Sequence, residues 1–142
     1  MIMPRLIAID FGTKRCGFAE TDDLQIIASP LTTVDTKSAF EFLKEYLGKY
    51  QVETIVVGDP RRWDDTDTHA TQPANAFCEK LSKLYPQIPV VREDESFTSK
   101  MAMQTMIDGG MKKKDRRVKG NLDKISAALI LQSYMRRREL NP

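Results

Sequence analysis

Short β-branched apolar runs follow one another closely at the start of the chain. Residues 6–9 (LIAI) form a continuous apolar run that ends at Asp10, which is typical of a buried central strand. After a turn, residues 16–21 are expected to return as the second strand of a hairpin. Residues 24–28, closed by Ser29 and Pro30, are predicted to form the third strand. The chain therefore opens with a three-stranded antiparallel meander.

The remainder of the chain alternates between helical and strand patterns. Apolar residues recur at helical spacing in 36–50 and in 73–84, and strands are predicted at 54–57 and 88–92. A loop is predicted at 61–72, and further helices are predicted from 98 or 99 to 108 and from 121 to about 138. This order predicts an α/β fold, a five-stranded mixed sheet with an antiparallel meander and parallel strands, flanked by helices.

Composition excludes several classes of protein. The 142 residues fit a single domain, 1–142, and 41% hydrophobic residues are enough for a core. No run approaches the roughly 18 apolar residues of a membrane span, and the first residues lack the pattern of a secretory signal. Cys16 and Cys78 are too few for a disulfide scaffold or a zinc site. We expect a cytoplasmic protein that does not bind membranes.

Charge is distributed unevenly, although the formal net charge is only +2. Residues 112–119 (KKKDRRVK) carry a local charge of +5, which leaves −3 on the rest of the chain. A basic segment on a mildly acidic body indicates a segment that binds a polyanion next to a site that uses carboxylates. The alternative is a solvated loop whose lysines serve only solubility, and charge alone does not decide between the two.

Three acidic residues stand out by their positions. Asp10 lies at the carboxyl end of the first predicted strand, where ligand sites form in α/β sheets. Glu95 lies just past the fifth predicted strand, in the acidic run 93–95. Asp123 lies on an apolar face of the last predicted helix, where an acid must cap the helix, be paired or bind metal. A turn-forming role for Asp10, a solvated strand end at Glu95 and helix capping by Asp123 are the alternatives.

Together these acids predict a metal site. Oxygen ligands without a set of histidines or cysteines suit a hard divalent cation such as Mg²⁺ or Mn²⁺. Two such ions can clamp both sides of a phosphodiester displacement, and the basic segment would hold the polyanion that the carboxylates repel. Asp59, at the end of the fourth predicted strand, is a candidate for an extra ligand near Asp10. Its alternative role is to shape the turn at 58–60.

Four stretches resemble the YqgF family, also called RuvX-like, of Holliday-junction resolvases and pre-16S rRNA nucleases. These are IAIDFGTKRCGFAETD at 7–22, IVVGDP at 55–60, PVVREDESFTS at 89–99 and KGNLDKISAALILQSYM at 119–135. The resemblance implies a ribonuclease H-like fold and a metal-dependent nuclease site, with Asp10, Glu95 and Asp123 as the matching acids. The chain departs from the family pattern at Ser96, where the family usually has arginine, and at Asp59, where the family tends to have an apolar residue.

We therefore expect an endonuclease that hydrolyses phosphodiester bonds in structured nucleic acid. Asp10 would bridge the metal ions, and Glu95 and Asp123 would complete the coordination. Trimming the 5′ end of pre-16S rRNA is the first expectation, cleavage of four-way DNA junctions the second, and a non-catalytic nucleic-acid-binding module the third. A junction resolvase should be a two-fold dimer, and this chain is expected to be a monomer or a weak homodimer. Contacts to nucleic acid are predicted for Thr13, Lys14, Lys112, Lys113, Lys114, Arg116, Arg117 and Lys119.

Overall fold

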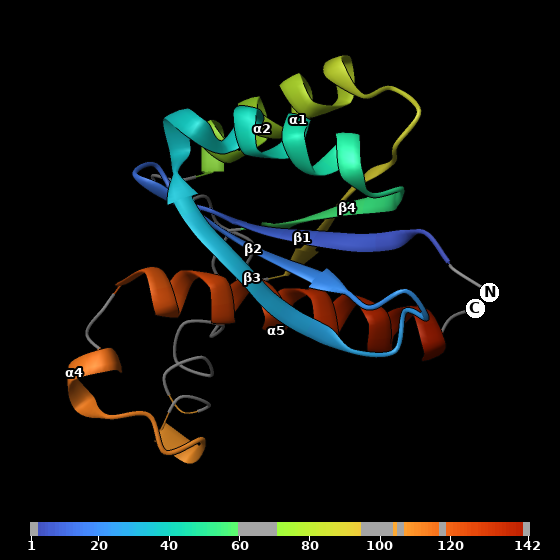
Figure 1. Ribbon diagram of the computed structural model, residues 1–142. Helices are drawn as coiled ribbons and strands as arrows, with labels where there is room; N and C mark the ends of the chain where they lie inside the picture. Colours follow the sequence, from blue (N-terminus) through green and yellow to red (C-terminus); the bar gives the residue numbers. More distant parts are fainter. Residues whose placement is uncertain (1–2, 60–70, 95–103, 105–106, 117–118, 141–142) are drawn as a thin grey trace.

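A five-stranded sheet forms the centre of the fold (Figure 1). The computed structural model describes residues 3–59, 71–94, 104, 107–116 and 119–140. The strands are β1 (Arg5–Phe11), β2 (Arg15–Thr21), β3 (Ala28–Asp35), β4 (Val52–Asp59) and β5 (Val90–Asp94). They lie in the order β3-β2-β1-β4-β5. The pairs β3–β2 and β2–β1 are antiparallel, and the pairs β1–β4 and β4–β5 are parallel. The predicted mixed sheet is confirmed.

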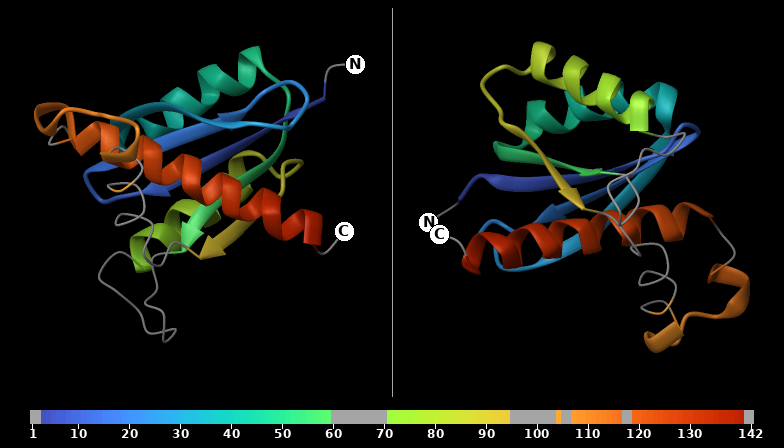
Figure 2. Two further views of the ribbon diagram at one scale, coloured as in Figure 1. Left: turned by 90° about the horizontal axis from the view of Figure 1, so that it is seen from below. Right: turned by 180° about the vertical axis from the view of Figure 1, so that it is seen from behind.

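Helices cover both faces of this sheet (Figures 1 and 2). On one face lie α1 (Ala39–Lys49), preceded by the 3-10 turn η1 (Thr36–Ser38), and α2 (Thr71–Leu84). The other face is crossed by α5 (Lys119–Leu140), which the short α4 (Lys113–Arg116) precedes. Among the helices that the structure describes, none is long and apolar enough to cross a membrane.

Side-chain alternation in β1 divides the core into two layers. Ile7 and Ile9 pack with α1 and α2, whereas Leu6 and Ala8 pack with α5, and all four are fully buried. Burial on both faces explains why this strand has a continuous apolar sequence rather than an alternating one. Because successive residues of a strand point to opposite faces, Asp10 belongs to the α5 face.

The third strand lies later in the chain than the sequence predicted. The structure has a turn at 23–25 and irregular backbone at 26–27, and β3 covers Ala28–Asp35 instead. The Asp22 carboxylate accepts hydrogen bonds from the backbone N–H groups of Ile26 and Ile27, at 2.7 and 2.8 Å. These local bonds compete with strand pairing, and the apolar side chains of the segment stay exposed.

Other boundaries differ for identifiable reasons. Pro30 lies inside β3 rather than ending a strand, which is tolerated because β3 is an edge strand with a partner on one side only. The helix α2 begins at Thr71, within the predicted loop 61–72, and α5 begins at Lys119, two residues earlier than predicted. The rest of that loop, and most of the helix predicted to end at 108, lie outside the described residues.

Candidate active site

A lateral row of residues links three strands beside the carboxyl end of β1. Asp10 pairs with Gly17 of β2, and Gly17 pairs with Thr33 of β3. Residues directly opposite each other in an antiparallel pair share a face of the sheet. Since Asp10 belongs to the α5 face, the whole row lies under the first turns of α5.

The beginning of α5 is seated on this row. The Thr33 hydroxyl donates a hydrogen bond of 2.6 Å to the backbone carbonyl of Gly120. At Gly17 a Cβ atom would lie only 2.1 Å from the backbone carbonyl oxygen of Asp123 and 2.7 Å from the backbone nitrogen of Lys124. Only glycine fits at this position, and its missing side chain is what lets Asp123 approach the strand that pairs with Asp10.

Asp123 forms an ion pair with Arg15 at the start of β2. The Arg15 Nε lies 3.0 Å from Asp123 Oδ2, and both side chains are partly exposed, at 34% and 23%. The alternative of helix capping is not supported, because α5 begins at Lys119 and Asp123 lies beyond the residues that cap a helix. The sequence did not single out Arg15; the available signal was its spacing of two from Gly17, which puts both on one strand face.

The charges of both acids also act on Cys16 in this hairpin. Burial raises the pKa of the Cys16 thiol, hydrogen bonds lower it, and the charges of Asp10 and Asp123 raise it further. Both carboxylates therefore lie within electrostatic range of one residue, the neighbour of Gly17 in β2.

Asp59 lies on the other side of the sheet. Val57, two residues earlier in β4, packs in the layer of α1 and α2, so alternation assigns Asp59 to that face. Its Oδ1 lies 3.9 Å from Nη2 of Arg92. Burial raises the pKa of the Cys78 thiol in α2, and the charge of Asp59 contributes in the same direction. Alternation thus assigns Asp59 and Asp10 to opposite faces of the sheet, and an extra ligand at Asp59 stays a prediction.

The acidic run 93–95 contains residues in different surroundings. Glu93 faces α5 and is only 7% exposed. Its carboxylate accepts hydrogen bonds from Ser133 at 2.8 Å and from Nε and Nη2 of Arg137 at 2.9 and 2.6 Å. An arginine of the same chain thus neutralises this acid, with no need for a cation. Glu95 lies outside the described residues, so its role stays a prediction.

Asp10 and Asp123 are two of the predicted metal ligands that lie in the described part of the chain. Among the residues that the structure describes, no three histidines, cysteines, aspartates or glutamates form a group able to hold a metal ion. The two carboxylates fit Mg²⁺ or Mn²⁺ in donor chemistry, because these ions prefer oxygen ligands. The Ser126 hydroxyl, one turn after Asp123, is buried and has no hydrogen-bond partner in the described part of the chain. An additional polar ligand or water would satisfy it.

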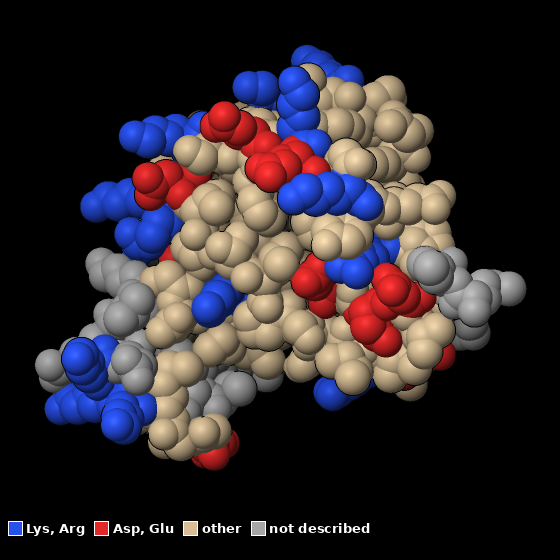
Figure 3. All heavy atoms as spheres, in the orientation of Figure 1, with Lys and Arg blue, Asp and Glu red and all other residues tan. Residues whose placement is uncertain are grey.

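Basic and polar side chains predicted to contact nucleic acid lie in two segments. Thr13 and Lys14 are exposed in the turn after β1, at the same edge of the sheet as Asp10. The lysines at 112–114 are exposed at α4, where Figure 3 shows a group of basic side chains projecting from the body. The structure does not describe the side chains of the remaining predicted contacts, Arg116, Arg117 and Lys119.

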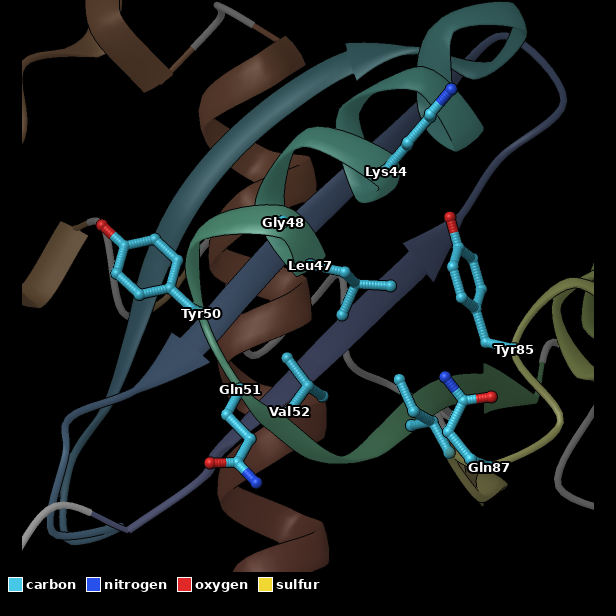
Figure 4. Close-up of a pocket in the computed structure, with 9 residues that line it drawn as sticks. Lys44, Leu47, Gly48, Tyr50, Gln51, Val52, Tyr85 and Gln87 are labelled. Carbon is cyan, nitrogen blue, oxygen red and sulfur yellow. The ribbon is translucent and has the colours of Figure 1, made fainter.

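A pocket of about 500 Å³ lies at the opposite edge of the sheet (Figure 4). Its lining comes from the end of α1, the start of β4 and the segment before β5, and includes Tyr50, Val52 and Tyr85. These are the amino ends of parallel strands, whereas ligand sites in α/β sheets form at the carboxyl ends. The pocket therefore does not belong to the candidate active site.

Known proteins resemble this chain over almost its whole length. The family model described as "RuvX: Holliday junction resolvase" matches residues 4–137. The chain belongs to the RuvX family. Among its curated relatives, a protein of Christiangramia forsetii named "Putative pre-16S rRNA nuclease" is 49% identical over 133 residues, which are 94% of this chain and 98% of the relative. A protein of Flavobacterium johnsoniae with the same name is 46% identical, over 94% of this chain and 96% of that protein.

A solved structure shows the same fold as this RuvX chain. T. thermophilus RuvC in complex with a Holliday junction substrate superposes with a TM-score of 0.57, at 17% identity, covering 94% of this chain and 96% of RuvC. At this identity the likeness concerns the fold alone. The predicted family and the ribonuclease H-like architecture are confirmed, and so is the predicted class, a nuclease that hydrolyses phosphodiester bonds.

Proposed function

We propose that this RuvX-family chain is an endonuclease that depends on Mg²⁺ or Mn²⁺ held by Asp10, Glu95 and Asp123. Its proposed substrate is structured RNA, and the proposed reaction is the processing of the 5′ end of pre-16S rRNA. We assign the activity to the cytoplasm, because bacterial rRNA precursors are made there.

The close approach of α5 to β2 is the observation that carries this proposal. Gly17 pairs with Asp10 and lies against the backbone of Asp123, so both acidic residues belong to one face of the sheet near the carboxyl end of the central strand. Neighbouring carboxylates repel one another, and a divalent cation relieves that repulsion. Glu95 is included because it directly follows β5, a strand parallel to β1.

The chain's own contribution is to orient the carboxylates that would hold the cation. A divalent cation bound there supplies Lewis-acid chemistry, since it activates water and neutralises charge on the phosphate. Asp10 is held by a central strand with neighbours on both sides, and Asp123 by a helix seated through the Thr33–Gly120 hydrogen bond. Ligands fixed on rigid elements need little rearrangement when a cation and a phosphate arrive.

Positive charge supports a polyanionic substrate. Lys14 lies at the sheet edge of Asp10, and the exposed lysines at 112–114 lie at the start of α4, shortly before α5. Salt-dependent contacts of this kind hold phosphates near carboxylates that would otherwise repel them.

The choice of RNA rests on the names of the relatives. The proteins that are 49% and 46% identical are named for pre-16S rRNA. The family description names the Holliday junction, which makes four-way DNA the second candidate. Symmetric cleavage of a junction needs a two-fold dimer, whereas trimming of RNA does not. We propose a monomer or a weak homodimer.

A cleavage assay with both substrates tests the proposal. A labelled RNA that carries the 5′ flank of 16S rRNA and a four-way DNA junction are incubated with the protein in Mg²⁺, Mn²⁺ or EDTA. We expect cleavage of the RNA with a divalent cation and none with EDTA. Cleavage of the junction alone would favour the second candidate. Binding of nucleic acid without cleavage in either metal would indicate a non-catalytic binding module.

A matched pair of variants tests the assigned acids. Asp10→Asn should abolish cleavage and weaken Mn²⁺ binding measured by calorimetry, because the amide removes the charge without changing the shape. Asp59→Asn makes the same change at the same sheet edge but on the opposite face, and both properties should survive. Circular dichroism checks that both variants are folded. Unchanged turnover in Asp10→Asn would refute the site.

A further inference from the structure

Arg15 pairs with a proposed cation ligand at a point where α5 has other contacts with the sheet. The start of α5 is already fixed by the Thr33–Gly120 hydrogen bond and by the backbone contact at Gly17. The Arg15 side chain, 34% exposed, nevertheless places Nε 3.0 Å from Asp123 Oδ2. A guanidinium therefore lies against the carboxylate that the proposed function assigns to a cation.

We propose that the Arg15 guanidinium neutralises Asp123 while no metal is bound. When a cation binds Asp123, the guanidinium moves to a phosphate of the substrate. This inference rests on the proposed function. Arg15 thus neutralises Asp123 in the metal-free chain and binds substrate in the loaded one.

Charge and geometry both support the exchange. A guanidinium and a divalent cation repel each other, so a cation bound at Asp123 weakens the Arg15–Asp123 pair. Arg15 directly follows Lys14 in the exposed turn, at the sheet edge of Asp10, and its partial exposure lets the guanidinium reach a bound phosphate. A guanidinium matches the geometry of phosphate oxygens better than an ammonium does, through two parallel hydrogen bonds.

A purely structural role for Arg15 makes a different prediction. If Arg15 only held Asp123 in place, its removal would loosen a metal ligand and weaken cation binding. The exchange predicts two effects of opposite sign: tighter cation binding without nucleic acid, and weaker nucleic-acid binding in the presence of the cation.

Three variants of the full chain separate these possibilities. Mn²⁺ affinity is measured by calorimetry without nucleic acid, and affinity for a labelled RNA hairpin is measured by fluorescence anisotropy with Ca²⁺ present. For Arg15→Gln we expect Mn²⁺ affinity to rise about two- to fivefold, which corresponds to the free energy of a partly exposed ion pair. We expect RNA affinity to fall about tenfold, the value of one charge-assisted hydrogen bond.

Two further variants serve as controls. Arg15→Lys keeps the charge but loses the two parallel hydrogen bonds, so it should restore only part of the RNA affinity. Lys37→Gln removes one positive charge from the exposed 3-10 turn η1, whose Thr36 N–H donates a hydrogen bond to the Lys14 carbonyl. It measures the general effect of charge and should change both affinities less than Arg15→Gln does.

The outcomes distinguish the inference from the function on which it rests. If Mn²⁺ binding to the wild type does not depend on Asp10 and Asp123, the proposed metal site is wrong. If it does depend on them, but Arg15→Gln binds Mn²⁺ no more tightly than Lys37→Gln, the exchange by Arg15 is refuted and the metal site stands. Thermal unfolding of Arg15→Gln and Arg15→Lys confirms that the comparison concerns folded protein.

Discussion

Gly17→Ala is the substitution that tests the packing of the site most directly. The added Cβ would lie 2.1 Å from the backbone oxygen and 2.3 Å from the backbone carbon of Asp123. An ordinary van der Waals contact starts at 3.4 Å, so the first turns of α5 must move away from β2 by more than about 1 Å. The obstacle is helix backbone, which cannot rotate aside as a flexible side chain does.

The expected cost follows from this displacement. Overpacking a closely packed interior costs typically about 1–3 kcal/mol, and the backbone clash places Gly17→Ala near the upper end. With a urea dependence of about 2 kcal/mol per molar, the unfolding midpoint should fall by about 1–1.5 M. Because the displaced segment carries Asp123, Mn²⁺ affinity should fall as well.

Gly48→Ala is the matched control. Gly48 lies near the end of α1, and a Cβ there meets no atom within 4 Å. The same chemical change should raise stability slightly, by up to about 1 kcal/mol, because alanine loses less conformational freedom in a helix. Urea unfolding followed by circular dichroism measures both variants. A midpoint for Gly17→Ala equal to that of the wild type would refute the close approach of α5.

Three other perturbations have defined outcomes. Arg137→Ala should lower the free energy of unfolding by about 1–2 kcal/mol, because the buried Glu93 loses charged donors. Arg136→Ala, at an exposed neighbour, should change that free energy little. Equal losses in the two variants would contradict a stabilising role of the Arg137–Glu93 pair. Backbone N–H groups of Ile27 and its neighbours lower the pKa of Asp22 below 3.8, so its contribution to stability is present above pH 3.8 and is lost as pH falls below it. The stability difference between wild type and Asp22→Asn should shrink across that range in urea titrations, and a constant difference would argue against the turn. The basic segment is neutralised by placing Gln at Lys112, Lys113, Lys114, Arg116, Arg117 and Lys119. The change should weaken nucleic-acid binding without sequence preference and flatten its salt dependence, by up to about 0.9 log unit per lost contact on duplex DNA and about 0.7 on single strands. An unaltered salt slope would show that the segment faces solvent.

Local patterns in the sequence determined most of the architecture. The apolar run 6–9, the turn after it and the helical spacing in 36–50 each depend on neighbours in the chain, and these elements lie where they were predicted. The third strand was misplaced because the Asp22 carboxylate binds backbone N–H groups of its own segment, a competition that hydrophobicity does not report. The family motifs were also readable, since they are contiguous.

The arrangement of the site was decided by the tertiary structure. Periodicity could place Asp10 at a strand end and Asp123 on an inward helix face, but nothing local shows that Gly17 lies between them. Arg15 and Asp123 form their ion pair across 108 positions of the sequence, and Arg137 neutralises Glu93 across 44. Which face a residue such as Asp59 takes depends on how the two faces of the sheet are covered, so its separation from Asp10 appears only once the helices have packed. The acidic residues and most of the strands can be identified from the sequence alone. The packing of α5 on β2 decided that Asp123 lies beside the strand that pairs with Asp10, because that contact joins segments that share no local pattern.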